Sequence, residues 1–178
     1  MSDFRRSVAP VGWPDTAVLT SARLRLEPVT IGHADAMVDV LADPDLYTFI
    51  GGEPPTVEEL RKRYAFWQTP LSPDGSEGWL NWIVVRAAGS TAVGTVQATI
   101  ADDSGPVADI AWVIGAPYQR QGYATEASAT MAGWLAEHGV ERLRANVAPG
   151  HLASEGVAAR LGMRLTPVVV DGERRWST

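Results

Sequence analysis

The sequence contains no cysteine, and this absence removes several kinds of chemistry. Disulfide bonds, thiolate metal sites and a cysteine nucleophile all need a thiol group, so they are excluded. No apolar run approaches the roughly 20 residues that span a bilayer, and residues 1–20 lack the apolar segment of a signal peptide. We therefore expect a cytoplasmic protein with no membrane partner.

Positive charge is also scarce. The 15 Lys and Arg residues are outnumbered by 21 Asp and Glu residues, so the net charge is -6 at pH 7. Because non-specific nucleic-acid binding depends on clustered Lys and Arg, this balance argues against a nucleic-acid partner. His33 and His138 suggest no metal site.

Length and hydrophobic content indicate one domain. A chain of 178 residues, 46% of them hydrophobic, is long enough for one substantial core. Residues 1–20 carry two prolines and no clear periodicity, so we expect them to form a loosely ordered arm. Residues 21–178 are expected to form the domain.

Hydrophobic periodicity predicts a mixed α+β sheet with helices on its faces. Alternating or short apolar runs predict strands over 23–29, 79–86, 92–100, 107–114 and 142–149, followed by a C-terminal hairpin that turns at Asp171 and Gly172. Apolar steps of three and four, with capping residues, predict helices over 34–41, 57–68, 123–138 and 152–161. The stretch YTFIGGEPP, residues 47–55, is expected to be a flexible loop.

The stretch QRQGYAT, Gln119 to Thr125, joins an apolar strand to the start of a helix. Unpaired backbone N–H groups and the helix dipole make such a turn a ready phosphate site. The stretch is neither GxxxxGK[ST] nor GxGxxG, so the P-loop and dinucleotide interpretations both fail. Its pattern is Q-x-x-G-x-A, which by itself fits a simple helix entry with a steric glycine equally well.

Q-x-x-G-x-A between a strand and a long helix resembles the coenzyme A pyrophosphate loop of the GNAT N-acetyltransferase superfamily, whose pattern is R/Q-x-x-G-x-G/A. The stretches TSARLRLEPVT, GYATEA and HLASEGVAARLGM resemble the RimJ/RimL branch, which acetylates protein N-termini and small amines. His151 stands where that branch commonly has asparagine, whereas Ser154, Leu161, Gly162 and Met163 fit its pattern. The resemblance runs from about Thr20 to the C-terminus.

This resemblance implies a fold and a cosubstrate. The fold is a central, mostly antiparallel sheet of six to seven strands, which splays between the fourth and fifth strands and is flanked by about four helices. The cosubstrate is acetyl-CoA, and no metal is implied. The pantetheine arm would pair like an extra strand with Val113, Ile114 and Gly115.

The resemblance also implies which residues hold the rest of the coenzyme. The loop residues expected at the pyrophosphate are Gln119, Arg120, Gln121, Gly122, Tyr123, Ala124 and Thr125. Gly122 has no Cβ to block the approach. Arg120 would add a charge-assisted contact or, equally, be a solvated surface arginine. His151 is expected to cap the next helix or touch the coenzyme.

Transfer of the acetyl group to an amine needs a neutral amine, a donor to the developing oxyanion and a proton for the thiolate. Because the chain has no cysteine, an acetyl-cysteine intermediate is impossible, and direct transfer in a ternary complex is the simpler route. Asp109 aligns with the glutamate base of histone-type members and, being shorter, would act through water. Its alternative is a strand-edge aspartate satisfied by nearby backbone. Glu126 is the rival carboxylate, with a structural role as its alternative.

Two further groups complete the implied catalytic set. A backbone N–H near Val113 would hold the oxyanion. Ser154 matches the hydroxyl that the family offers as general acid, and orienting the coenzyme sulfur is an equal alternative.

The acceptor cleft implied by the resemblance lies between the loop after the first helix and the inner strands. Aromatic and acidic side chains there suit an amine with an apolar body. Trp79 and Trp82 are three apart on one strand and face opposite sides, so at least one should be in the core. The candidate acceptor contacts are Phe49, Glu53, Trp79, Asn81 and Trp82.

Three functions therefore remain open. The first is an N-acetyltransferase that acts on a small-molecule amine, and the second is the same chemistry on a protein N-terminus. The third is a non-catalytic acyl-CoA-binding module that signals to a partner. Each is compatible with a homodimer.

Overall fold

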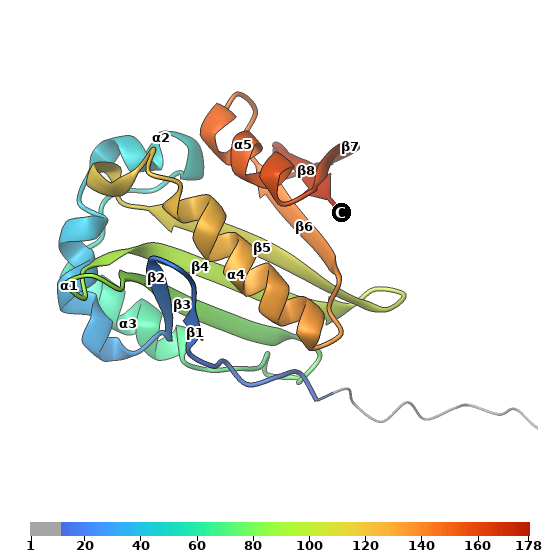
Figure 1. Cartoon of the computed structure of the whole chain (residues 1–178), viewed down its shortest axis with the longest axis horizontal. Helices are drawn as coiled ribbons and strands as arrows, with labels where there is room; N and C mark the ends of the chain where they lie inside the picture. The colour runs from blue at the N-terminus through green and yellow to red at the C-terminus, as the bar shows by residue number, and fades with distance from the viewer. Residues whose placement is uncertain (1–11) are drawn as a thin grey trace, which may run out of the picture.

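The computed structural model describes residues 12–178, which form an open eight-stranded sheet between helices (Figure 1). The strands are β1 (Leu19–Thr20), β2 (Leu24–Pro28), β3 (Gly78–Arg86), β4 (Ala92–Asp102), β5 (Pro106–Ile114), β6 (Arg142–Val147), β7 (Arg164–Val170) and β8 (Glu173–Ser177). The α-helices are α1 (Ala34–Val40), α2 (Tyr47–Ile50), α3 (Val57–Trp67), α4 (Tyr123–Glu137) and α5 (Leu152–Arg160). Three short 3-10 turns are η1 (Ile31–His33), η2 (Pro44–Leu46) and η3 (Ala116–Tyr118).

The strand order is β1-β2-β3-β4-β5-β6-β8-β7, and neighbouring strands are antiparallel except β5 and β6. The parallel pair is short, because its register ends at Asp109 opposite Arg144. Beyond that point the two strands diverge, as Figure 1 shows, and α5 follows the end of β6. The predicted mixed α+β fold is confirmed, with eight strands and five α-helices in place of six to seven and about four.

Alternation along the strands produces two hydrophobic cores, one on each face of the sheet. On β3, Leu80, Trp82 and Val84 belong to the core that α4 covers. Ile83 and Val85 point the other way, into the core under α1 and α3. The two helices cover only one end of that second face. At the other end, Asn81 and Trp79 border an open pocket.

The helix boundaries follow local capping chemistry. Thr56 Oγ1 accepts the N–H of Glu59 at 3.3 Å, and Glu59 Oε2 accepts the N–H of Thr56 at 2.7 Å, so the predicted capping box begins α3. The segment predicted as a flexible loop contains α2 instead. It follows η2, whose N-cap Asp43 accepts the N–H of Asp45 at 2.9 Å.

Residues 12–20, within the expected N-terminal arm, make tertiary contacts with the rest of the domain. Trp13 packs against Gly78 and donates its indole N–H to Ser76 at 3.2 Å. Trp82 donates its indole N–H to the carbonyl of Ala17 at 2.7 Å. These tertiary contacts order residues that have no periodicity of their own, whereas residues 1–11 lie outside the described part of the chain.

Among residues 12–178, no helix combines the length and the apolar character that a membrane crossing requires.

Candidate active site

The loop before α4 has the geometry of an anion-binding turn. Gly122, the N-cap of α4, has φ 82°, and Arg120 has φ 59°, so two left-handed residues flank Gln121. No side chain caps the helix. Within the described chain, no protein acceptor meets the backbone N–H groups from Gln121 to Thr125, and Glu126 is the first to bond back, to Gly122 at 3.0 Å. Such convergent, unpaired N–H groups at a helix start attract an anion.

Side chains of the same segment hold the loop in place. Gln119 donates its amide N–H to the carbonyl of Ile114 at 3.0 Å, and Gln121 donates to the carbonyl of Pro117 at 3.3 Å. The N–H of Gly115 also has a partner, because it donates to the carbonyl of Val93 at 2.9 Å. Of the three predicted pantetheine positions, the Gly115 N–H and the Ile114 carbonyl are therefore already paired within the protein.

A pocket of about 390 Å³ opens on the face of the sheet that α1 and α3 leave uncovered. Its floor comes from β3, β4 and β5, and its far wall comes from β6 and β8, so it reaches across the divergence of β5 and β6. The residues that line it are Phe66, Trp67, Trp79, Asn81, Gln97, Ala98, Thr99, Asp109, Ile110, Ala111, Asn146 and Glu173.

One side of this pocket is aromatic and the opposite side is polar. Phe66 and Trp79 pack with ring centroids 5.3 Å apart. Asn81 is held by two bonds, because it accepts from Gln97 at 2.7 Å and donates to the carbonyl of Trp67 at 3.2 Å. The pocket thus has fixed walls and combines apolar area with a few oriented polar groups, as small-molecule sites do.

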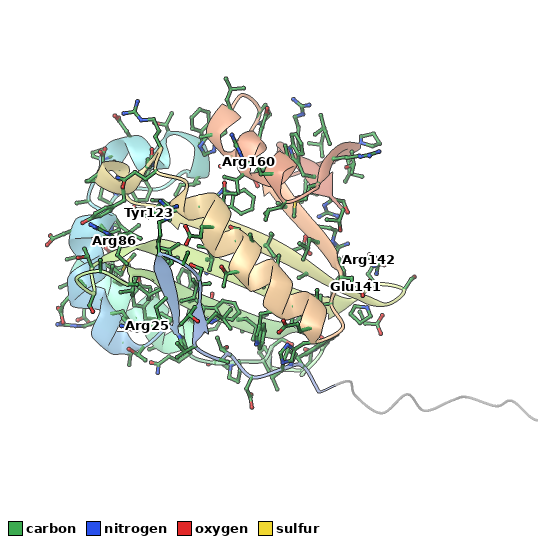
Figure 2. All side chains as sticks on the ribbon, in the orientation of Figure 1. Arg25, Arg86, Tyr123, Glu141, Arg142 and Arg160 are labelled. Carbon is green, nitrogen blue, oxygen red and sulfur yellow. The ribbon has the colours of Figure 1, made fainter. Side chains whose placement is uncertain are left out.

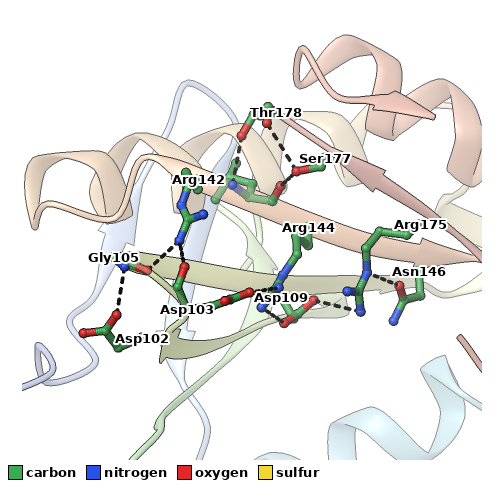
Figure 3. A network of polar contacts seen from close by, with 11 residues as sticks. Asp102, Asp103, Gly105, Asp109, Arg142, Arg144, Asn146, Arg175, Ser177 and Thr178 are labelled. Carbon is green, nitrogen blue, oxygen red and sulfur yellow. Dashed lines mark hydrogen bonds and ion pairs between the residues drawn. The ribbon is translucent and has the colours of Figure 1, made fainter. Parts of the chain in front are cut away.

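Asp109 lies in the pocket wall where the β5–β6 pairing ends, within a charged network (Figure 3). Its Oδ2 accepts from Arg144 at 3.0 Å, and Arg175 lies 4.0 Å from its Oδ1. Arg175 also donates to Asn146 at 3.2 Å. The buried Oδ1 has no hydrogen-bond partner among the described residues. The partners of this carboxylate are therefore arginine side chains rather than nearby backbone, and they leave Oδ1 without a hydrogen bond.

Glu173 is a second acidic residue of the pocket, and sequence reasoning missed it. Burial, and then the nearby charge of Asp171, raise the pKa of Glu173 above its ordinary value of 4.5. Within residues 12–178 its carboxylate forms no hydrogen bond or ion pair, unlike that of Asp109. The Asp171-Gly172 turn was recognised only as a hairpin signal, although it brings Glu173 to the pocket.

Comparison with known proteins identifies the family. The family profile of the Acetyltransferase (GNAT) domain matches residues 23–164. This chain belongs to the GNAT acetyltransferase family. An uncharacterized N-acetyltransferase of Bacillus subtilis, YjdG, is 26% identical over 151 residues, which cover 83% of this chain and 90% of the relative.

Solved structures share the fold of this acetyltransferase. A ribosomal L7/L12 alpha-N-protein acetyltransferase, RimL, in complex with coenzyme A superposes with a TM-score of 0.76 at 17% identity, covering 91% of this chain and 97% of the other. The microcin C7 self-immunity acetyltransferase MccE, in complex with acetyl-CoA and AMP, gives a TM-score of 0.72 at 14% identity, covering 89% and 93%.

The predicted acceptor contacts of this acetyltransferase separate into two groups. Trp79 and Asn81 line the pocket. Trp82 does not, because it is 1% exposed in the core under α4, with Trp134 edge-on at 5.8 Å. Phe49 and Glu53 also lie outside the pocket lining, because they belong to α2 and the exposed segment after it.

His151 and Phe49 form a contact between distant elements. Their rings stack in parallel at 4.3 Å, so the start of α5 is held to α2. Burial lowers the pKa of His151, and the charge of Glu155 opposes this only partly. His151 is the N-cap residue of α5, but its side chain makes no capping bond. Ser154, in the first turn of the same helix, is half-buried and outside the pocket lining.

Glu126 has a structural environment. It accepts from Ser21 at 2.7 Å and from Arg23 Nε at 2.7 Å, and it does not line the pocket. Arg23 is not among the predicted site residues, although it lies in the stretch TSARLRLEPVT that carries the family resemblance. Among residues 12–178 there is also no cluster of three His, Asp or Glu side chains that could hold a metal ion.

Proposed function

We propose that this protein transfers an acetyl group from acetyl-CoA directly to the primary amine of a small molecule held in the 390 Å³ pocket. The observation that carries the proposal is the position of this pocket. It combines aromatic walls with two carboxylates, and it reaches across the divergence of β5 and β6. Rings pack against an apolar body and carboxylates attract an ammonium group, so the lining suits an amine.

The loop before α4 fits the pyrophosphate of the coenzyme. Its free N–H groups run from Gln121 to Thr125, and a Cβ on Gly122 would approach only the tip of the Arg23 side chain, at 3.4 Å. The backbone there is thus open to a bulky anion. When bound, acetyl-CoA would supply the acetyl thioester, and the edge of β5 near Val113, which β6 leaves uncovered, would offer backbone groups to the pantetheine arm.

Glu173 is the better-placed base of the two pocket carboxylates. It has no cationic partner in the described chain, and its raised pKa suits a group that takes a proton from an ammonium ion. In Asp109, Arg144 already occupies Oδ2 and Oδ1 is buried, so this carboxylate is less available for proton transfer and would act on the amine through its charge at the pocket wall. We therefore assign proton removal to Glu173 and orientation of the amine to Asp109.

The remaining groups act on the other side of the reacting bond. As the amine nitrogen bonds to the acetyl carbon, the carbon–sulfur bond breaks, the amine gives up one proton and the thiolate gains one. A backbone N–H near Val113 would donate to the carbonyl oxygen as negative charge develops there. Ser154 would supply or relay the proton that the sulfur receives.

Acetylation of a protein N-terminus is the second candidate function. A neighbouring pocket of about 320 Å³ shares Trp67 and Asn81 with the first, so a peptide could extend from one to the other. The similarity in fold to the RimL enzyme adds support. A small amine would fill the first pocket alone.

An acceptor screen tests these functions. Release of coenzyme A would be followed with a thiol reagent against panels of small amines, aminoglycosides and peptides, since the chain itself has no cysteine to react. We expect turnover with small amines, and Trp79→Ala should raise the KM for the amine. Turnover with peptides alone would favour the second function. Tight coenzyme binding with no release on any panel would point to a non-catalytic acyl-CoA-binding module.

A further inference from the structure

We propose that Arg23 is a positioning residue of the coenzyme loop: it fixes the Gln121 carbonyl and neutralises Glu126, so that the loop can accept a pyrophosphate. Arg23 lies between β1 and β2, some hundred positions from the loop in sequence. The inference rests on the proposed coenzyme site, and it concerns how this chain builds that site.

Arg23 touches the loop and the start of α4 at three places. Its Nη1 donates to the carbonyl of Gln121 at 3.0 Å. Its Nε and Nη2 lie 2.7 Å and 2.6 Å from Glu126 Oε2. The guanidinium carbon lies 4.8 Å from the ring centroid of Tyr123, which Figure 2 shows at the start of α4 beside the β1–β2 turn.

The loop needs such an external hold. Arg120 and Gly122 both have positive φ, and a non-glycine residue in that region is strained. No side chain caps α4. A peptide unit whose carbonyl is tied by Arg23 cannot easily rotate, so the bond to Gln121 fixes the orientation of the adjacent Gly122 N–H group. The result is preorganisation of the donors before any anion arrives.

Arg23 also changes the charge that an anion would meet. Glu126 is the acidic residue in the first turn of α4, where a bare carboxylate would repel a pyrophosphate. Arg23 pairs with Oε2, while Ser21 and the Arg23 backbone N–H donate to Oε1 at 2.7 Å and 2.9 Å. Burial would raise the pKa of Glu126, but these bonds hold it below its ordinary value of 4.5.

Arg25, two residues further along the chain on β2, provides a matched comparison. Its side chain is 42% exposed against 50% for Arg23, and it also pairs with a carboxylate, Glu27. Within residues 12–178 none of its side-chain hydrogen bonds or ion pairs reaches the loop. A variant of Arg25 therefore removes the same charge and a similar ion pair without touching Gln121 or Glu126.

The test compares two ligands that differ in the pyrophosphate. Coenzyme A binding would be measured by calorimetry, and pantetheine, which lacks the nucleotide and its pyrophosphate, by ligand-detected NMR. We expect Arg23→Gln to weaken coenzyme A by about tenfold or more, because bonds to charged groups of this strength are lost. Arg25→Gln should bind both ligands as the wild type does, and pantetheine affinity should be equal in all three proteins.

A second variant separates the two roles of Arg23. In Arg23→Gln with Glu126→Gln, the uncompensated carboxylate is gone, so part of the lost coenzyme A affinity should return. If Arg23→Gln does not fold, Arg23→Lys keeps the charge but cannot span both partners, and an intermediate loss is expected.

Two results would overturn the inference: unchanged coenzyme A affinity in Arg23→Gln, or an equal loss for coenzyme A and pantetheine, which would mark Arg23 as merely structural. Failure of the wild type to bind coenzyme A would instead overturn the proposed function.

Discussion

At the scale of single residues, Gly122 and Glu173 carry most of the proposed chemistry. Gly122 has φ 82° and an exposed backbone at the start of α4. Glu173 has a raised pKa in the pocket, and its position depends on a hairpin at the far end of the chain. The first was predictable from a local pattern, whereas the second was not.

Gly122→Glu should abolish coenzyme A binding, because it places bulk and negative charge beside the free N–H groups of the loop. Gly139→Glu is the matched control. Gly139 follows the other end of α4 and has φ 81°, and a Cβ added there would meet nothing within 4 Å. Both variants suffer similar backbone strain, so only the first should lose affinity in calorimetry. Unchanged affinity in Gly122→Glu would exclude this loop as the coenzyme site.

Glu173→Gln should lower kcat by about 100-fold or more with little change in coenzyme affinity, as expected for loss of a general base. In the wild type the rate should rise with pH through the pKa of Glu173, above 4.5, because only the carboxylate accepts a proton. Asp171→Asn removes a charge that raises this pKa, so the acidic limb should move to lower pH. Pre-steady-state rates across pH would check both, and a wild-type profile in Glu173→Gln would remove it as the base.

At the scale of elements, the site depends on the contact between β4 and β5 and on the divergence of β5 from β6. Gly94 faces Ile114 across the β4–β5 ladder, and a Cβ there would overlap the Val113 carbonyl. The close approach of these backbones fixes the part of β5 that lies before the coenzyme loop.

Gly94→Ala should therefore lower the free energy of unfolding by about 1–3 kcal/mol, because overpacking forces the backbone to shift. It should also weaken coenzyme A, since the shift falls at Val113. Gly133→Ala is the control, because a Cβ there meets nothing within 4 Å and the helix gains a better helix former. Denaturant titration of the two variants would give opposite signs, and equal stability would contradict the packing argument.

At the scale of the whole molecule, carboxylates with lowered pKa values couple stability to pH. Burial opposes the effect, but His33 and Arg25 hold the pKa of Glu27 below 4.5, and Ser21 and Arg23 do so for Glu126. Each carboxyl binds its proton more weakly in the folded chain. Its contribution to the free energy of unfolding is complete above the ordinary pKa of 4.5. It is lost as the pH falls through the lower pKa of the folded state. Glu173, with its raised pKa, has the opposite sign.

The melting temperature should therefore fall as the pH drops below 4.5, the ordinary pKa of a glutamate. Glu27→Gln should be less stable than the wild type at neutral pH and should differ less from it in acid, whereas Glu58→Gln, a largely exposed control, should match the wild type throughout. Calorimetric melting over this pH range would measure both. A constant difference between Glu27→Gln and the wild type would rule out the linkage.

Most of the fold could be read from the chain because its patterns are local. The predicted helix over 57–68 is α3, and the strand over 107–114 is β5, each within one residue at each end. The α2 helix was missed because it is a single turn that follows η2, too short for a periodic pattern. The contacts of Trp13 and Ala17 with β3 could not be predicted, because no local pattern encodes a contact between such distant residues.

The sequence by itself determined the element order, the family resemblance and the glycine loop, because capping, periodicity and a short motif act over neighbouring residues. Only the tertiary structure decided which carboxylates share the pocket, why Trp82 is core, and that Arg23 supports the loop. The physical reason is distance along the chain. Asp109 meets Arg144 and Arg23 meets Glu126 only after the strands have paired, and strand register is a property of the assembled sheet.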